Sequence, residues 1–355
     1  MTILEEYGIP SDVAREYADA ARITAAHKER YEIASPRGLT YGKLKPSVYY
    51  NNGSEPFPTT GDFVLAQYNP AGDSVIYKTL PRCSVFTRRD PDLGRGEQAI
   101  AANFDYVFIM TSLNQNLNAR RVERYLSAAW QSGAVPVVLL TKADLLTQAD
   151  QTVSRGMEAE AARIQSAAAG VDVIPISVVT GAGLERVREY ARPGKTIVFL
   201  GSSGVGKSSL VNALAGEELM AVKDIREDDS RGRHTTTHRQ LLLLPGGAIV
   251  IDTPGMRELG MWEADEGITG AFSDIEAILS RGCKFSDCRH ITEAGCAIRQ
   301  AIRDGELDEA RWQNYMRLRK EAEYAEDRAA AMRDKRARNK AIAIWSKQYN
   351  LMKDK

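Results

Sequence analysis

Cysteine is scarce in this chain, long apolar runs are absent, and neither sign of charge is in excess. The 355 residues include 4 cysteines, which excludes a disulfide-stabilised scaffold. No apolar run approaches the ~20 residues of a membrane-spanning helix, and residues 1–6 lack the basic start of a signal peptide. Lys and Arg total 47 against 47 Asp and Glu, which excludes a uniformly basic nucleic-acid coat but not local patches. We therefore expect a cytoplasmic protein without a membrane segment.

The amino-terminal third of the chain changes character at about residue 35. Hydrophobic residues make up 43% of the chain, enough for ordinary cores, and ~150 residues per domain predicts two to three domains. The spacing of Val13, Tyr17 and Ala21 predicts a helix over Ser11–Arg30. From residue 35 to 97, Gly and Pro separate short β-like runs, which predicts a small barrel or sandwich, and a length of about 60 residues fits a five-stranded oligonucleotide-binding (OB) barrel. These runs are Ser47–Tyr50, Asp62–Gln67, Ser74–Thr79 and Ser84–Thr87.

From residue 99 the chain alternates between apolar runs and helical patterns, which predicts an α/β domain with a parallel sheet. The expected strands are Tyr106–Met110, Pro136–Leu140, Val171–Ile176, Thr196–Leu200 and Ala248–Ile251, with helices near 118–132, 149–169, 183–191 and 207–215. Beyond about residue 270 a Cys/His cluster precedes a helical, increasingly basic segment. The expected organisation is a helical extension at 1–34, an OB-fold barrel at 35–98, the α/β domain at 99–270, and a small α-helical domain with a basic tail at 271–355.

Residues 201–208, GSSGVGKS, match the phosphate-binding pattern G-x-x-x-x-G-K-[ST] between an expected strand and an expected helix. Glycines let backbone N–H groups wrap the phosphates, and the start of the following helix adds partial positive charge. Lys207 would reach the β- and γ-phosphates, and the Ser208 hydroxyl would ligate Mg²⁺. The pattern predicts a nucleoside triphosphate site made by Gly201, Ser202, Ser203, Gly204, Val205, Gly206, Lys207, Ser208 and Ser209.

A second strand, 249–251, ends in Asp252-Thr253-Pro254-Gly255, a D-x-x-G pattern. Asp252 can join the Mg²⁺ shell, and the Gly255 N–H can contact the γ-phosphate. By itself this pattern is weak, but 44 residues beyond Ser208 it corroborates the phosphate site.

The strand at 137–140 ends in Thr141-Lys142-Ala143-Asp144, a [NT]-K-x-D pattern. The Asp144 carboxylate can accept hydrogen bonds from the ring N–H and the amine of guanine; adenine lacks this pair of donors, so we expect GTP as substrate and GDP as product. The Lys142 stem would pack over the base, and Ser177 suits a backbone contact to the guanine oxygen. Thr141 stands where Asn is commoner, and we expect it to cost a supporting hydrogen bond to the P-loop region.

These motifs stand in an unusual order, because the base-reading segments (141–144 and 177–183) precede the P-loop and D-x-x-G patterns. A sheet tolerates such a circular permutation when the original termini lie close together. With Ala101-Ala102-Asn103-Phe104-Asp105, Gly232-Arg233-His234-Thr235-Thr236-Thr237 and Cys283-x4-Cys288-x-His290-x5-Cys296, the chain resembles the circularly permuted GTPases that assist late maturation of the small ribosomal subunit, the RsgA or YjeQ family. The resemblance covers about residues 35–310 and implies an OB barrel, a permuted P-loop GTPase and a zinc domain.

Position 256, where many GTPases carry a water-orienting Gln, is Met, and a thioether cannot orient a water. The resemblance implies that His234 serves instead, with His238 as its competitor. One of Thr235, Thr236 and Thr237 is expected to complete the Mg²⁺ shell; we include Thr236 in the expected site.

The cluster Cys283, Cys288, His290 and Cys296 offers three thiolates and one imidazole within fourteen residues. Such a closed set suits one tetrahedral structural Zn²⁺, with no open position for catalysis. Cys83 and His27 have no partners in sequence, and we expect both to fill core or surface.

From Arg328 the tail carries nine basic and two acidic residues, a local charge of +7. With a barrel and a zinc module on the same chain, we expect contact with the rRNA of the small ribosomal subunit, and Arg82, Arg88 and Arg89 are further candidates. We expect a monomer whose GTP hydrolysis is stimulated by the subunit and releases it. Three alternatives stay open: a permuted GTPase of the large subunit, an RNA-binding scaffold that holds GTP structurally, and a P-loop ATPase.

Overall fold

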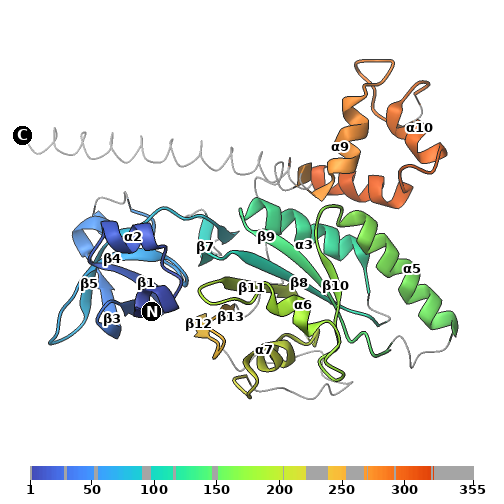
Figure 1. Ribbon diagram of the computed structural model, residues 1–355. Coiled ribbons are helices and arrows are strands. Elements are labelled where there is room, and N and C mark those ends of the chain that lie inside the picture. The colour runs from blue at the N-terminus through green and yellow to red at the C-terminus, as the bar shows by residue number, and fades with distance from the viewer. Residues whose placement is uncertain are drawn as a thin grey trace, which may run out of the picture. The chain divides into compact units, whose positions relative to one another are not determined.

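The computed structural model describes residues 2–27, 30–51, 55–89, 97–114, 117–145, 151–202, 204–220, 239–252, 268–269, 271–291, 293–320 and 323. The chain forms two compact units, residues 1–260 and 261–355. Figure 1 shows that the first unit combines a barrel with an open sheet and that the second is helical. The expected basic tail from Arg328 lies outside the described residues.

The barrel has five strands, in the order β1-β2-β3-β5-β4, and closes because β4 also pairs with β1. The strands are β1 (Ala20–Ala26), β2 (Tyr31–Ser35), β3 (Gly38–Leu44), β4 (Phe63–Gln67) and β5 (Ser74–Thr79). All pairings are antiparallel except that of β3 with β5. The inward side chains include Ile23, Ile33, Tyr49, Val64 and Ile76. The expected OB-fold barrel is therefore confirmed.

The barrel begins fifteen residues earlier than expected, so the prediction of a helical extension at 1–34 is wrong from residue 20. Two short helices, α1 (Ile3–Glu6) and α2 (Ser11–Glu16), precede β1. Alanine favours helices in isolation, which explains the helical prediction for the Ala-rich run. In the fold, six of the seven β1 residues are buried, and tertiary burial overrides the local preference.

Two of the expected barrel strands take other roles. Ser47–Asn51 forms a short π-helical turn, η1, whose Tyr49 packs into the barrel. The run at 84–87 becomes β6 (Val85–Arg89), which pairs with β7 (Glu97–Ala102) in a separate two-stranded hairpin. The predictions for 62–67 and 74–79 are confirmed as β4 and β5.

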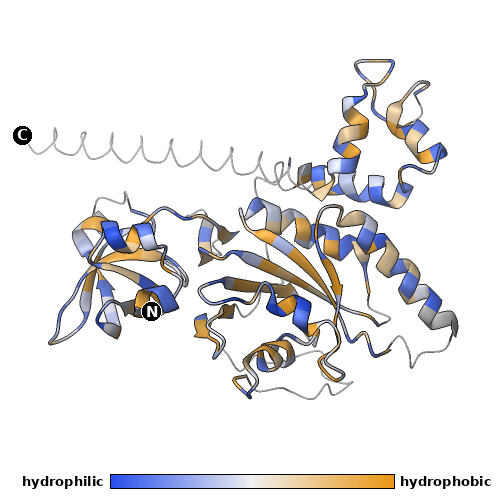
Figure 2. Ribbon diagram, viewed as in Figure 1, coloured by the Kyte–Doolittle hydropathy of each residue, from blue (hydrophilic) through white to orange (hydrophobic). Residues whose placement is uncertain are grey.

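The open sheet has the order β10-β9-β8-β11-β13-β12, with β12 as the antiparallel strand. Its strands are β8 (Tyr106–Ser112), β9 (Val135–Thr141), β10 (Val173–Pro175), β11 (Thr196–Gly201), β12 (Gln240–Leu243) and β13 (Ile249–Asp252). All five expected parallel strands are present. Figure 2 shows hydrophobic residues concentrated on these strands, as expected for a sheet covered on both faces.

Helices cover both faces of this sheet (Figure 1). On one face lie α3 (Ala119–Gln131) and α5 (Gln151–Ala167), which follow β8 and β9. On the other lie α6 (Leu184–Arg188) and α7 (Lys207–Ala215), whose apolar residues share a core with Phe108, Phe199 and Val250. This is the doubly wound arrangement that right-handed crossovers produce.

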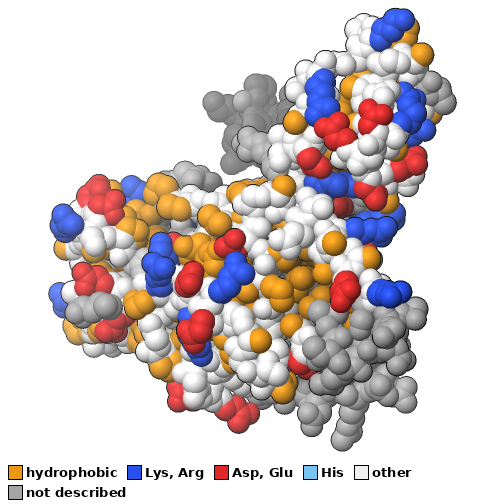
Figure 3. All heavy atoms as spheres, turned by 45° about the vertical axis from the view of Figure 1, so that its right-hand side comes forward, with side chains coloured by type: hydrophobic (Ala, Val, Ile, Leu, Met, Phe, Trp, Pro, Cys, Tyr) orange, Lys and Arg blue, Asp and Glu red, His pale blue; other side chains and the backbone are white. Residues whose placement is uncertain are grey.

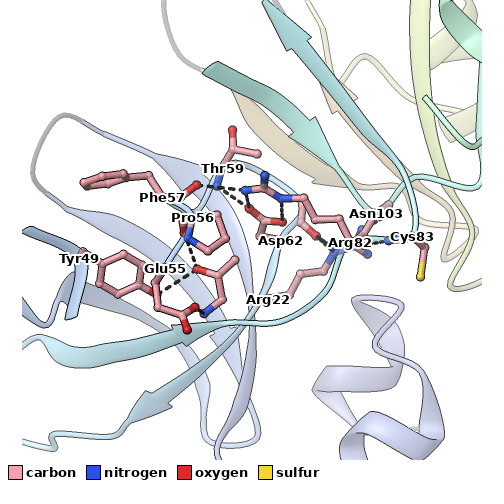
Figure 4. Close-up of polar contacts among 12 residues, drawn as sticks. Arg22, Tyr49, Glu55, Pro56, Phe57, Thr59, Asp62, Arg82, Cys83 and Asn103 are labelled. Atoms are coloured by element: carbon pink, nitrogen blue, oxygen red, sulfur yellow. Dashed lines mark hydrogen bonds and ion pairs between the residues drawn. The ribbon is translucent and has the colours of Figure 1, made fainter. Parts of the chain in front are cut away.

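Barrel and open sheet are joined by β1, which pairs with β12 through Ala25 and Gln240. Next to this seam, Arg22 of β1 is 0% exposed. Its guanidinium donates to the carbonyls of Tyr7 (2.6 Å), Gly61 (3.3 Å) and Asn103 (2.8 Å). Figure 4 shows Arg22 beside Asn103. One side chain thus connects the amino-terminal segment, the barrel and the start of the GTPase domain.

Burial lowers the pKa of Arg22 to about 10, against the opposing fields of Asp105 and Asp62. The group therefore remains charged at neutral pH. The buried Asp62 carboxylate accepts two hydrogen bonds from Arg82, at 2.8 and 2.7 Å (Figure 4). A buried charge is tolerated when it is paired or hydrogen-bonded, and this junction meets that condition.

The second unit contains α9 (Ser273–Ser280), α10 (Ala297–Arg303) and helical residues 309–320. Its core includes Phe272, Ile275, Ile298 and Tyr315, all 0% exposed. The Arg311 side chain donates to Asp274 and lies 4.6 Å from the centre of the Phe272 ring. These contacts hold residues 309–320 against α9.

We predict that Arg22→Met destabilises the first unit by about 3–5 kcal/mol, because three buried carbonyls lose their charged donor. Chemical denaturation followed by circular dichroism measures this difference. The matched control is Arg30→Met: Arg30 pairs with Asp73 at the surface, where an ion pair contributes about 1 kcal/mol or less. Equal losses for the two variants would contradict the role given to Arg22.

Candidate functional site

The expected nucleotide-binding segments meet at one edge of the open sheet. Gly201 ends β11, Thr141 ends β9, and Asp252 ends β13. The neighbouring strands run parallel, with Gly201 opposite Met110 and Thr141 opposite Ser112. Ligands of such sheets bind outside the carboxyl ends of the strands, and the sheet therefore assembles the site whatever the chain order.

The P-loop has the backbone that its glycines predict. Gly204 and Gly206 adopt positive φ values of 72° and 101°, and Gly206 directly precedes α7. A Cβ on Gly201 would lie 2.7 Å from the carbonyl oxygen of Met110, so the strand end tolerates only glycine here. Val205 is 1% exposed and anchors the loop in the core. Ser203 lies outside the described residues.

The side chain of Thr141 holds the base-reading strand to the P-loop. Its hydroxyl donates to the carbonyl of Val205 at 2.8 Å. The expectation that threonine at this position costs a supporting hydrogen bond is therefore wrong. Thr141 is 2% exposed, and its hydroxyl makes the hydrogen bond to the P-loop without the amide that Asn would provide.

Asp144 is held by Ser177, whose hydroxyl donates to Asp144 Oδ1 at 2.6 Å. Lys142 has a positive φ of 59°, which turns the chain out of β9, and the Ala143 N–H donates to Ile176 at 3.0 Å. The backbone N–H of Ser177 donates to the Ala182 carbonyl, which leaves its expected contact with the guanine oxygen without support. Sequence reasoning missed the orienting role of the Ser177 hydroxyl, for which the spacing carries no signal.

The strand that ends in Asp252 completes the described part of the site. Ile251 lies opposite Val198 of β11, so β13 runs beside the P-loop strand. Several predicted residues lie outside the described residues, namely Ser203, His234, Thr235, Thr236, Thr237, His238 and Gly255.

The second unit contains a separate candidate metal centre. The Nδ1 atom of His290 lies 3.6, 3.7 and 3.4 Å from the Sγ atoms of Cys283, Cys288 and Cys296. Zinc with Zn–S of about 2.3 Å and Zn–N of about 2.0 Å places sulfur and nitrogen about 3.5 Å apart in a tetrahedron. The four ligand atoms all lie within 4.8 Å of one another, so the donor set fits Zn²⁺.

The local fold supports this set of donors. Cys283 Sγ accepts from the Ala297 N–H at 3.4 Å, and Cys296 Sγ accepts from the Arg299 N–H at 3.5 Å. The His290 ring lies edge-on to Trp312, with ring centres 5.5 Å apart. Such contacts fix ligand orientation, and four protein ligands leave no open position. The cluster is therefore suited to a structural ion.

The order of strands and motifs defines the class: a circularly permuted P-loop GTPase, in which the base-reading strand precedes the P-loop strand. A family model described as RsgA GTPase matches residues 79–262. The chain belongs to the RsgA GTPase family and is a GTP hydrolase.

Curated relatives and solved structures agree with this assignment. The chain is 41% identical over 346 residues to "Small ribosomal subunit biogenesis GTPase RsgA 1" of Listeria monocytogenes, covering 96% of both chains. It is 40% identical over 333 residues to "Small ribosomal subunit biogenesis GTPase RsgA" of Methanosarcina acetivorans, covering 93% of this chain and 87% of that one. The crystal structure of YjeQ from Thermotoga maritima matches with a TM-score of 0.62 and 25% identity, covering 84% of this chain and 96% of that chain.

We predict that the zinc-loaded protein has one fast-reacting thiol out of 4 cysteines, because Cys83 is exposed and the other three are ligands. Removing the metal with a strong chelator should raise the count to four. Thiol titration with a chromogenic reagent measures this, alongside one zinc per chain by mass spectrometry.

The variant Cys83→Ser is the control, for which the thiol count should rise from zero to three. Four fast thiols in protein that contains a full equivalent of zinc would show that the metal binds elsewhere.

Proposed function

We propose that this protein acts in maturation of the small (30S) ribosomal subunit. In the GTP form it binds the immature subunit; the subunit stimulates hydrolysis of GTP to GDP and phosphate, and hydrolysis releases the protein. The observation that carries the proposal is a permuted GTPase sheet on the same chain as an OB barrel and a Cys₃His cluster. The names of the relatives, small ribosomal subunit biogenesis GTPase, support the choice of subunit.

In the proposed complex the P-loop residues bind the phosphates, with Lys207 contacting the β- and γ-phosphates. Ser208 and Asp252 would hold Mg²⁺, which would neutralise charge developing on the phosphates. Asp144, oriented by Ser177, selects guanine, and the stem of Lys142 packs over the base. The hydrogen bond from Thr141 to Val205 keeps base and phosphate subsites in register.

We assign the water-positioning role to His234, because Met256 replaces the usual glutamine. A neutral imidazole nitrogen accepts a hydrogen bond from water well, whereas a thioether sulfur is only a weak acceptor. Thr236 is the proposed threonine of the Mg²⁺ shell.

Among the described surfaces, that of the barrel suits rRNA binding better than that of the second unit. A groove of about 680 Å³ is lined by Arg37, Lys45, Tyr68 and Tyr77, beside the acidic Asp19. The Arg37 guanidinium lies 4.5 Å from the centre of the Tyr68 ring. Cations for phosphates beside aromatic rings for bases are typical of single-strand binding.

Of the arginines expected to contact RNA, Arg82 is engaged by the buried Asp62 and its side chain is 18% exposed. These contacts assign Arg82 to the junction and make it a weaker candidate for RNA contact than an arginine that is exposed. Arg88 donates to Gln98. On the face shown in Figure 3, the basic side chains among the described residues of the second unit lie between acidic ones.

Among the described helices, none is long and apolar enough to cross a membrane. We propose that the protein works in the cytoplasm as a monomer.

We predict that purified small subunits raise kcat for GTP about tenfold or more, because the subunit orders the catalytic group around the γ-phosphate. Phosphate release with and without subunits measures this effect. Large subunits serve as the control, both for stimulation and for co-sedimentation of the GTP-bound protein. Stimulation by large subunits alone would assign the protein to that particle, and no stimulation by either would refute the coupling.

We predict that His234→Ala lowers subunit-stimulated kcat by about 100-fold or more, the usual range for loss of a group that handles the attacking water. The affinity for GDP should stay within about twofold, because His234 is not assigned to nucleotide binding. The matched control is His238→Ala, which should retain stimulated turnover. Loss of stimulated turnover in His238→Ala but not in His234→Ala would assign the water-positioning role to His238.

A further inference from the structure

Four residues of the barrel, Thr59-Thr60-Gly61-Asp62, lie between η1 and β4 and face the GTPase sheet; we call them the junction loop. Thr59, Thr60 and Asp62 are 4%, 0% and 0% exposed. Polar residues this deeply buried need hydrogen-bond partners. Their partners therefore show what the loop holds in place.

Thr60 connects three elements. Its hydroxyl donates to the carbonyl of Arg239 at 3.2 Å. Its own carbonyl accepts from the N–H of Ala102, the last residue of β7, at 3.1 Å. Arg239 directly precedes β12 (Gln240–Leu243). Thr60 thus holds the residue that leads into this strand.

Gly61 lies against the strand that ends in Asp252. With φ at +94°, it leaves no room for a side chain: a Cβ would be 2.1 Å from the Ala102 carbonyl oxygen and 2.9 Å from Ile251 Cδ1. Its N–H donates to Ile23 of β1, and its carbonyl accepts from Arg22. The loop is therefore held on both sides, by the barrel and by β13.

The residue after Arg239 lies between the barrel and the nucleotide site. Gln240 of β12 pairs with Ala25 of β1 on one side and with Asp252 of β13 on the other. Only Gln240 therefore lies between Ala25 of β1 and Asp252 of β13, so a displacement of β1 or of the junction loop can be transmitted to the Asp252 strand through this residue. Hydrogen-bonded contacts of this kind form the contiguous networks through which energetic coupling can travel.

We propose that the junction loop, through Thr60, is a positioning element for GTP hydrolysis that couples the barrel to the strand ending in Asp252. Thr60 acts through the backbone: its hydroxyl holds Arg239 where the chain enters β12, and the next residue, Gln240, pairs with Asp252. This inference rests on the proposed function, because the role of Asp252 is taken from it. A ligand bound to the barrel would then change the rate of GTP turnover without contacting the nucleotide.

The test compares two threonine-to-valine variants in the full chain. Thr60→Val removes the hydroxyl that holds Arg239 and keeps the shape of the side chain. We expect kcat to fall about three- to tenfold, which corresponds to one net hydrogen bond, with KM for GTP within about twofold. Thr60→Ser keeps the hydroxyl and should restore kcat to at least about half of the original value.

The matched control is Thr79→Val, which removes a hydroxyl that donates to the Pro56 carbonyl at 2.9 Å inside the barrel. Because the Thr79 hydroxyl also bonds the Tyr49 hydroxyl at 2.9 Å, this variant should lose at least as much thermal stability as Thr60→Val and keep kcat. If Thr60→Val and Thr79→Val give the same kcat, or if Thr60→Ser fails to restore it, the inference is overturned.

Turnover is measured with and without small subunits, which separates this inference from the proposed function. Absence of stimulation in the unaltered protein would refute the proposed function. The intrinsic kcat of Thr60→Val against Thr79→Val would still decide whether the junction loop positions the strand that ends in Asp252.

Discussion

The site depends on one constraint, the convergence of parallel strands at their carboxyl ends. Thr141, Gly201 and Asp252 each end a strand of one sheet, and the register of β8, β9 and β11 brings these ends to the same edge. Chain order is irrelevant to this geometry, which explains how a permuted chain can assemble a GTPase site. The hydrogen bond from Thr141 to Val205 then links two segments that are distant in sequence.

Because the chain is permuted, strands of the nucleotide site are attached directly to the other parts of the molecule. The chain that leaves Asp252 continues directly into the second unit. On the other side, β12 pairs with β1 of the barrel. The strands β13 and β12 are thereby attached to different parts of the chain, β13 to the second unit by covalent continuity and β12 to the barrel by hydrogen bonds.

The sequence was sufficient for the parts of the fold that carry a strong local pattern. Continuous apolar runs predicted the parallel strands, because a strand covered on both faces needs no polar alternation. The spacing of Cys283 to Cys296 predicted a donor set that the structure brings within 4.8 Å. In both cases a few neighbouring residues determine the outcome.

The features that escaped prediction depend on contacts between distant residues. The run Ala20–Ala26 reads as a helix because alanine prefers one, yet burial inside the barrel makes it β1. The residues near Arg22 in sequence do not predict that its partners are Tyr7, Gly61 and Asn103. The orienting contact of Ser177 with Asp144 spans 33 positions.

The buried charges at the junction are better suited to fixing one arrangement than to adding stability. Burying Arg22 and Asp62 carries a desolvation cost that well-packed apolar side chains would avoid. The guanidinium of Arg22, however, fits few other arrangements of its partners. Its N–H donors are directional, and the three carbonyls that it bonds come from three separate segments. An apolar junction of equal area would tolerate sliding of the barrel against the GTPase sheet. Directional hydrogen bonds oppose such sliding and keep the barrel in register with β12, which pairs with β1 through Gln240 and Ala25.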